Sequence, residues 1–179
     1  GYFRRAISEY LMPFIMIRSL KKKSLIESNL DGIITYAPSI FFGPLTNMLK
    51  IENKCKSYLI LRDIFPQWAV DLGLIKSYGL PYYFFKRVER YLYSTADFIG
   101  VQTPANLKYF NENEVNVKGH VEVLQNWLAV SKSKKFTIEV KNTSLKGRKI
   151  FVYAGNMGDA QGLSVFIDLA ESLKTQKNF

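Results

Sequence analysis

Short apolar runs alternate along this chain with longer amphipathic segments, and this alternation limits the possible folds more than any other feature. The runs have the length of strands, and the segments between them have the length of helices. The expected strands cover residues 33–37, 57–61, 97–101, 121–124 and 150–154. Strands separated by helices of about ten or more residues favour parallel pairing. The sequence therefore predicts an α/β protein with parallel sheets.

Proline, serine and threonine mark where the expected helices begin. Ser39 is expected to cap the second helix, Pro81 suits the first turn of the third, and Thr103 starts the fourth. Pro13 is expected to kink the first helix. The third helix should bury Phe84, Phe85, Val88, Tyr91 and Leu92 and expose Lys86, Arg87, Glu89 and Arg90. Alternatively, its aromatic and basic part, residues 82–93, lies on a membrane or stacks on nucleic acid. The five expected helices cover residues 4–28, 39–50, 79–96, 103 to about 111, and 163–173.

The composition changes after residue 130 and indicates two domains. Residues 131–148 are rich in Lys, Ser and Thr, as in a linker or a surface insertion. Residues 1–130 lack a glycine-rich first turn and are interpreted as the later part of a Rossmann-like domain. Residues 149–179 are interpreted as the first strand–helix unit of a second one. The chain begins with Gly1 and ends directly after an amphipathic segment, so both ends are expected to be fragment boundaries.

The net charge of +10 is divided evenly, at +5 on each side of residue 130. A spread charge indicates an anionic partner: nucleic acid, a phosphate-bearing substrate or an acidic membrane surface. The longest apolar run, Tyr10–Ile17, has eight residues, whereas a membrane-spanning helix needs about 18. Cys55 is the one cysteine, so an internal disulfide framework is excluded, and this usage suits the cytoplasm. His120 is the one histidine, so a histidine metal site and a Ser-His-Asp triad are excluded.

The loop from Gly155 to Gly162 follows an expected buried strand and leads into a helix. Glycine lets the backbone approach a ligand, and a helix N-terminus offers free N–H groups to an anion. The loop is therefore interpreted as a diphosphate cradle or, alternatively, as a tight turn that needs glycine for packing. The candidate residues of this loop are Gly155, Asn156, Met157, Gly158, Gln161 and Gly162.

A second candidate site follows the expected strand 57–61. Ligands bind at the carboxyl ends of strands in open parallel sheets. There Arg62 suits a phosphate, and Asp63 suits a sugar hydroxyl or a proton; the alternative is an Arg–Asp pair that braces a loop. Ser39, after the expected strand 33–37, joins them as a candidate site residue.

These segments together resemble the retaining glycosyltransferases of family four in the GT-B fold class, and in particular the bacterial fucosamine transferases of O-antigen and capsule assembly. The resemblance covers about residues 30–175, and the segment from Phe151 is its most specific part. Four segments carry it: Leu61–Pro66 with Leu72-Gly73; Glu89-Arg90 with Ala96–Ile99 and Gln102-Thr103; Val121–Trp127; and Phe151–Gly158 with Ala160–Leu163.

The resemblance implies two facing Rossmann-like domains and a sugar transfer that keeps the anomeric configuration. A nucleotide diphosphate sugar would bind mainly to the C-terminal domain, where the candidate loop residues of 155–162 would be donor-binding. A saccharide or lipid-linked acceptor would approach from the N-terminal domain, where Arg62, Asp63 and Ser39 are the acceptor-side candidates. Neither a metal nor a cofactor is expected, and neither is nucleic acid. The catalytic residues are unknown, because the family's donor-binding pair of glutamates is absent; Glu114 and Glu122 share only its spacing. The chain alone is therefore expected to be inactive.

Two other functions stay open at this point. A basic module that binds nucleic acid or an acidic surface would explain the charge, and a GT-B sugar-nucleotide epimerase would share the fold.

The expected location is the cytoplasm, with peripheral binding to the inner face of the plasma membrane. It rests on Arg4, Arg5, Arg18 and residues 21–23, which surround the apolar part of the first helix.

Overall fold

The computed structural model describes residues 2–24, 29–37, 39–113, 115, 117–129, 139–158 and 161–175. The chain divides into two compact units, Gly1–Trp127 and Leu128–Phe179. The assignment of the units to an acceptor-side and a donor-binding domain, with a linker at 131–148, stays a prediction.

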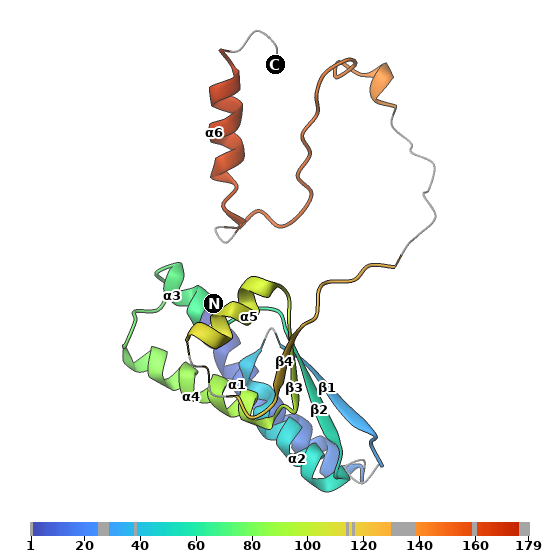
Figure 1. Cartoon of the computed structure of the whole chain (residues 1–179), viewed down its shortest axis with the longest axis vertical. Helices are drawn as coiled ribbons and strands as arrows, with labels where there is room; N and C mark the ends of the chain where they lie inside the picture. Colours follow the sequence, from blue (N-terminus) through green and yellow to red (C-terminus); the bar gives the residue numbers. More distant parts are fainter. Residues whose placement is uncertain are drawn as a thin grey trace. The chain divides into compact units, whose positions relative to one another are not determined.

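Unit 1 contains a four-stranded parallel sheet in the order β1-β2-β3-β4 (Figure 1). The strands are β1 (Gly32–Ala37), β2 (Lys56–Leu61), β3 (Phe98–Val101) and β4 (His120–Val123). Ala37 pairs with Leu61, Leu61 with Val101, and Val101 with Val123. The carboxyl ends of all four strands are therefore level at one edge of the sheet. The predicted α/β class and parallel pairing are confirmed.

The helices of unit 1 connect these strands. They are α1 (Tyr2–Lys22), the 3₁₀ helix η1 (Ile40–Phe42), α2 (Gly43–Asn53), α3 (Gln67–Asp71), α4 (Leu80–Thr95) and α5 (Pro104–Glu112). Right-handed crossovers between strands in consecutive order place their helices on the same face of the sheet. The core agrees, because one cluster joins the buried faces of β2 and β3 to α4 and α5. Its buried members are Ala37, Ile40, Phe41, Leu59, Leu61, Leu92, Tyr93, Ala96, Ile99, Val101 and Phe110.

The opposite face of the sheet is apolar and exposed to solvent. Ile34 on β1 is 74% exposed, and Tyr36 and Phe98 are also well exposed. Tyr58 stacks on Phe98 with ring centroids 6.2 Å apart, and its hydroxyl donates to Glu122 Oε1 at 2.8 Å. Burial and this glutamate raise the pKa of Tyr58 to about 12. This face carries side chains of the type that usually contact a second layer of helices.

Two predictions about the helices of unit 1 are wrong in detail. Ser39 precedes the short helix η1 rather than one continuous helix, and its side chain makes no capping hydrogen bond. The first turn of α2, which contains Pro44, follows η1. In α4, Glu89 is buried, whereas Phe84 and Tyr91 are about half exposed. The buried stripe of α4 is thus rotated toward Leu92 and Tyr93, because contact with β2 and β3 selects the buried face and the local apolar pattern does not.

Helix α1 ends at Lys22, before the predicted end at residue 28: residues 23 and 24 form a turn, and residues 25–28 lie outside the described residues. Pro13 is inside the helix. Tyr10 contacts Phe41 and Phe84, with centroids 5.7 and 6.4 Å apart, so α1 packs on η1 and α4. Among the helices that the structure describes, none is long and apolar enough to cross a membrane.

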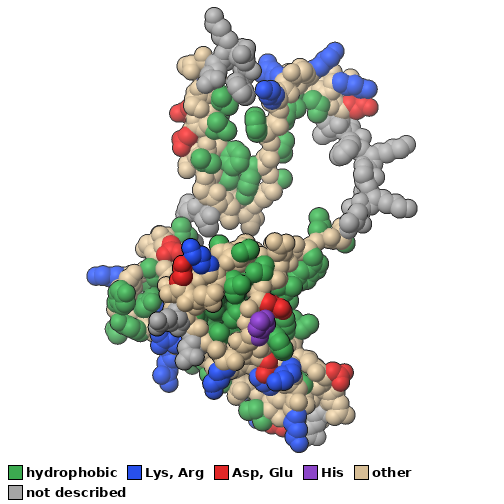
Figure 2. Space-filling view, viewed as in Figure 1, with side chains coloured by type: hydrophobic (Ala, Val, Ile, Leu, Met, Phe, Trp, Pro, Cys, Tyr) green, Lys and Arg blue, Asp and Glu red, His purple; other side chains and the backbone are tan. Residues whose placement is uncertain are grey.

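Unit 2 contains the 3₁₀ helix η2 (Val140–Asn142) and helix α6 (Ser164–Leu173). Helix α6 confirms the prediction at 163–173. The predicted buried strand at 150–154 is wrong for this structure: the segment forms no strand, and Val152 is 79% exposed. A strand needs a neighbour to pair its N–H and C=O groups, and the described part of unit 2 offers none. Figure 2 shows the uncovered hydrophobic side chains of this unit.

Candidate functional site at the carboxyl edge of the sheet

The topology brings three of the predicted acceptor-side residues to one edge of unit 1. Ser39 follows β1, and Arg62 and Asp63 follow β2 directly. Because Ala37 and Leu61 are in register, these residues come after strand ends that are level with each other. This carboxyl edge is where ligands bind in open parallel sheets. The sequence indicates these residues separately, and the strand order places them at the same edge.

Gln102, which follows β3, belongs to the same edge. Its side-chain Nε2 donates a hydrogen bond to the backbone carbonyl of Arg62. This bond ties the loop after β2 to the loop after β3. In the sequence Gln102 belongs only to a segment of family resemblance, and its role was missed, because register, and not spacing, brings residues 62 and 102 together.

Arg62 and Asp63 do not brace the loop as an ion pair. The ion pairs within 4.0 Å among described residues include neither of them. Arg62 is half-buried, and Asp63 is exposed. Asp63 is therefore open to a ligand from solvent. Ser39 differs, because its Oγ is buried and has no hydrogen-bond partner among the described residues.

Thr103 caps α5 at this edge. Its hydroxyl Oγ1 accepts a hydrogen bond from the backbone N–H of Asn106 at 3.1 Å. The first turn of α5 therefore begins at the carboxyl end of β3, as the sequence predicted from Thr103-Pro104.

The predicted donor loop of unit 2 is closed by two local hydrogen bonds. The Tyr153 hydroxyl donates to the Asn156 carbonyl at 2.8 Å, and the Gly158 N–H donates to Gln161 Oε1 at 2.9 Å. Met157 is largely exposed, and residues 159 and 160 lie outside the described residues. A diphosphate in this loop would thus compete with Gln161 for the Gly158 N–H group.

Glycine is needed for backbone conformation at only one of the three loop positions. Gly162 has a φ of +58°, in the left-handed region, whereas Gly155 and Gly158 have no positive φ. A Cβ at Gly155 would meet the Tyr153 hydroxyl at 2.9 Å, and one at Gly158 would meet Gln161 Oε1 at 2.9 Å. Both neighbours are the ends of side chains. Substitution at Gly155 therefore tests close approach without backbone strain.

The amino edge of the sheet holds a charge cluster that fixes β2 against β3. Asp97 contacts Lys50 Nζ at 2.7 Å and Lys56 Nζ at 3.3 Å, and it accepts from the Ser57 N–H at 2.9 Å. Partial burial of Asp97 opposes ionisation, but these three partners outweigh it and lower its pKa to about 2. This cluster lies at the edge opposite the candidate site and is structural.

A second group of polar residues, which the sequence pattern predicted on a solvated face, lies on α4. Lys86 Nζ contacts Glu89 Oε2 at 2.7 Å, and Glu89 is 1% exposed. Burial raises the pKa of Glu89, although Lys86, Tyr93 and Arg90 act in the opposite direction. The packing around α4 buries Glu89, whereas a glutamate within a group of charged residues is expected on the exposed face of a helix.

The described residues hold no group of three His, Cys, Asp or Glu side chains that could bind a metal. His120 is the first residue of β4 and is exposed, with its ring 6.4 Å from that of Phe98. Cys55 is a free, half-buried thiol.

Comparison with known proteins shows similarity to one that is named a probable glycosyltransferase. The chain is 23% identical over 136 residues to "Probable glycosyltransferase WbjE" of Pseudomonas aeruginosa. This match covers 73% of the chain and 33% of the relative, so the chain spans about a third of the relative's length. No protein-family model matches the chain, and no solved structure matches it. The similarity supports a glycosyltransferase at a general level.

Proposed function

We propose that this chain is part of a glycosyltransferase that moves a sugar from a nucleotide diphosphate sugar to a saccharide or lipid-linked acceptor. The single observation that carries the proposal is the similarity to a probable glycosyltransferase over most of the chain. The parallel sheet supports it, because this architecture places ligands at the carboxyl edge where Ser39, Arg62 and Asp63 lie. Fold alone would not identify the chemistry.

The finer proposal is a GT-B enzyme of family four that acts in bacterial surface polysaccharide synthesis, as a hexosyltransferase with retention of configuration. Support for it comes from the four sequence segments that resemble this family. In this proposal unit 1 receives the acceptor, and Asp63 and Arg62 bind its hydroxyl or phosphate groups. The leaving nucleotide diphosphate gains negative charge, so backbone N–H donors and basic side chains stabilise the transition state.

Unit 2 would receive the donor diphosphate through the loop Gly155–Gly162. Ligand binding would exchange the hydrogen bond between Gly158 N–H and Gln161 for one to a phosphate oxygen. The Gln161 amide would then turn its NH₂ group to the ligand. The cost of breaking one neutral hydrogen bond is offset by bonds to a charged phosphate, which are stronger.

The decisive test is sugar transfer by the full-length protein from a panel of UDP-, GDP- and dTDP-linked sugars. Activity should persist in excess EDTA if the transfer needs no metal. Gly155→Val should abolish donor binding and turnover while the melting temperature stays near that of the wild type, because Gly155 needs no positive φ. Gly147→Val is not a suitable control, since Gly147 has a φ of +76°; Ser172→Val, at an exposed position on α6 outside the loop, serves instead. A stable Gly155→Val variant with normal transfer would refute the cradle.

We also propose that α1 binds an anionic membrane surface. Its last turn carries Lys21 and Lys22, followed by Lys23, and Ile15 and Leu11 are well exposed on the helix. Basic residues near an anionic leaflet contribute about 1 kcal/mol each. Flotation with vesicles that contain phosphatidylglycerol should recover the protein at low salt and lose it at high salt. Equal recovery with neutral vesicles would contradict an electrostatic surface.

A further inference from the structure

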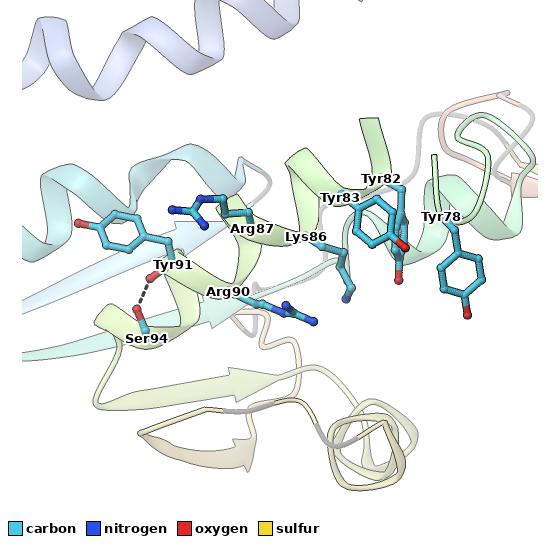
Figure 3. A pocket seen from close by; sticks show the side chains of 8 residues that line it. All are labelled: Tyr78, Tyr82, Tyr83, Lys86, Arg87, Arg90, Tyr91 and Ser94. Carbon is cyan, nitrogen blue, oxygen red and sulfur yellow. Dashed lines mark hydrogen bonds between the residues drawn. The ribbon is translucent and has the colours of Figure 1, made fainter. Parts of the chain in front are cut away.

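A hollow of about 570 Å³ lies along α4, apart in sequence from the residues of the carboxyl edge. Figure 3 shows Lys86 and Arg90 projecting from the same side of the helix, with the rings of Tyr82 and Tyr83 beside Lys86. The hollow combines cationic side chains with phenol rings. Its lining residues are Tyr78, Tyr82, Tyr83, Lys86, Arg87, Arg90, Tyr91 and Ser94.

The charge of this hollow is unbalanced. Three cations line it, and the lining that the structure describes includes no carboxylate. Neither Arg87 nor Arg90 takes part in an ion pair within 4.0 Å among the described residues. Lys86 is already paired with Glu89, whereas Arg90, four residues further along the helix, has no such ion pair among the described residues. A bound anion would give the Arg90 guanidinium a charged partner.

Glu89 holds Lys86 in place. The Lys86 side chain is only 15% exposed, and its ammonium contacts the buried Glu89 carboxylate at 2.7 Å. A lysine fixed in this way has already lost much of its rotamer freedom, so less entropy is lost when a ligand binds. Lys86 therefore differs from a surface lysine that extends into solvent.

A second hollow of about 470 Å³ adjoins the first and shares Tyr82, Lys86 and Arg90 with it. It adds groups that bond hydroxyls: the amides of Gln67 and Asn113, the carboxylate of Glu89, and the phenol of Tyr109, whose hydroxyl lies 3.5 Å from Gln67 Oε1. Burial and Glu89 raise the pKa of Tyr109 to about 12, so its phenol keeps its proton at neutral pH. Amides and phenols around an aromatic wall suit a polyhydroxylated ligand.

We propose that Lys86 and Arg90, with Tyr82, bind the phosphate or pyrophosphate group of a glycosyl phosphate, and that the adjoining hollow receives its sugar. The proposal rests on the proposed function, because a phosphate-linked saccharide is one form of the acceptor. Both hollows have the size of small-molecule sites, about 300–1,000 Å³. A protein surface that binds nucleic acid would not need a recessed lysine such as Lys86. The position of Lys86 therefore favours a small ligand.

The test measures binding to the 179-residue chain by calorimetry, with inorganic pyrophosphate, inorganic phosphate and glucose 1-phosphate as probes. Arg90→Gln should weaken pyrophosphate binding at least about tenfold, because a charge-assisted hydrogen bond is lost. Lys108→Gln is the matched control: Lys108 is exposed on α5, outside both hollows, and its removal should change the affinity less than about twofold. Equal weakening in both variants would overturn the site.

A second variant distinguishes a loss of pyrophosphate binding from misfolding. Replacing Lys86 alone would leave Glu89 buried without its partner, so the double variant Lys86→Gln, Glu89→Gln is used. It should keep the wild-type circular dichroism spectrum and lose pyrophosphate binding. Unchanged binding in a folded double variant would refute a role for Lys86.

The sugar part has its own measurement. Glucose 1-phosphate should bind at least about fivefold more tightly than inorganic phosphate, because its hydroxyls gain hydrogen bonds, and Asn113→Ala should remove that difference. Equal affinity of the two probes for the wild type would refute the assignment of the second hollow.

Vesicles separate this site from a membrane surface and from the donor loop. Arg90→Gln should leave flotation with phosphatidylglycerol vesicles unchanged, since the proposed lipid contact is on α1. Loss of flotation with no loss of pyrophosphate binding would show a lipid surface instead and overturn the pocket. The Gly155→Val prediction tests the donor loop of unit 2. Its failure would not contradict the phosphate site on α4, so the two failures can be told apart.

Discussion

Unit 1 and unit 2 carry the same sequence pattern, an apolar run followed by an amphipathic helix, and only unit 1 turns it into a sheet. In unit 1 each run has a parallel neighbour, and Ile99 and Val101 are fully buried. In unit 2 the run at 150–154 is exposed, and so are Val165 and Ile167 on α6. An apolar run thus specifies a strand only where a second run is available to pair with it.

The helices of the two units differ in the same way. Helix α4 buries Leu92 and Tyr93 against the sheet, whereas the described residues of α6 include none that is buried. The ring of Tyr153 lies 5.8 Å from that of Phe166, so the run and the helix of unit 2 do make contact. Such a pair alone excludes too little water to be stable.

Amide hydrogen exchange should show the largest difference between the two units. The N–H groups of β3 should exchange only on global unfolding, at least about a thousandfold more slowly than those of residues 151–154. Mass spectrometry of peptides from the two segments measures this. Comparable protection in both segments would mean that unit 2 forms a strand in solution.

Core truncation should give the next largest difference. Ile99→Ala, at a side chain with 0% exposure, should lower the free energy of unfolding by about 2–5 kcal/mol. Ile167→Ala, at 63% exposure, should change it by less than about 0.5 kcal/mol. Urea denaturation monitored by circular dichroism compares the two variants. A loss above about 2 kcal/mol for Ile167→Ala would place that side chain in a core.

Asp97→Asn tests how unit 1 holds its strands together. Asp97 has a pKa of about 2 in the folded state, below its ordinary 3.8. The carboxylate therefore stabilises the fold above pH 3.8, and this contribution is lost as the pH falls through 2. At about 1.36 kcal/mol per pKa unit, and allowing for solvent screening, the variant should lose about 1–2 kcal/mol at about pH 7.

The pH dependence supplies the control for that prediction. At about pH 2 most of the difference in unfolding free energy between the wild type and Asp97→Asn should be gone, because the folded-state carboxyl is then about half protonated and the unfolded-state carboxyl is almost fully protonated. A difference that stays constant from neutral pH down to this value would indicate a steric effect of the amide and contradict the ion-pair account.

The smallest effect concerns the helix caps. Thr103→Ala removes the hydroxyl that accepts from the Asn106 N–H and should cost about 1 kcal/mol. Helix α6 has Leu163 at the corresponding position, and Leu163 makes no side-chain capping hydrogen bond. Leu163→Ala therefore removes no cap and should leave the start of α6 unchanged. The melting temperature of Thr103→Ala reports the first change. A Thr103→Ser variant should retain stability, and its failure to do so would assign the effect to the methyl group.

The candidate site was predictable in part. Arg62, Asp63 and Ser39 could be selected because each follows an apolar run, and parallel pairing sends such residues to one edge. The bond from Gln102 to the Arg62 carbonyl could not be selected, because it depends on which residues of β2 and β3 are in register. The hydrogen bond from the Gly158 N–H to Gln161 Oε1, which closes the loop, could not be predicted either. It depends on the side-chain rotamer of Gln161, which residue spacing does not determine.

Local sequence was enough to predict the α/β class, the four strands of unit 1 to within about one residue, and the starts of α4 and α5. These follow from periodicity, proline positions and a threonine cap, which act within a few residues of the chain. Long-range packing was needed to bury Glu89 beside Lys86, to leave one sheet face bare and to leave residues 150–154 without a strand. The physical reason is that burial and strand pairing require partners distant in sequence, and the local pattern does not specify whether those partners are there.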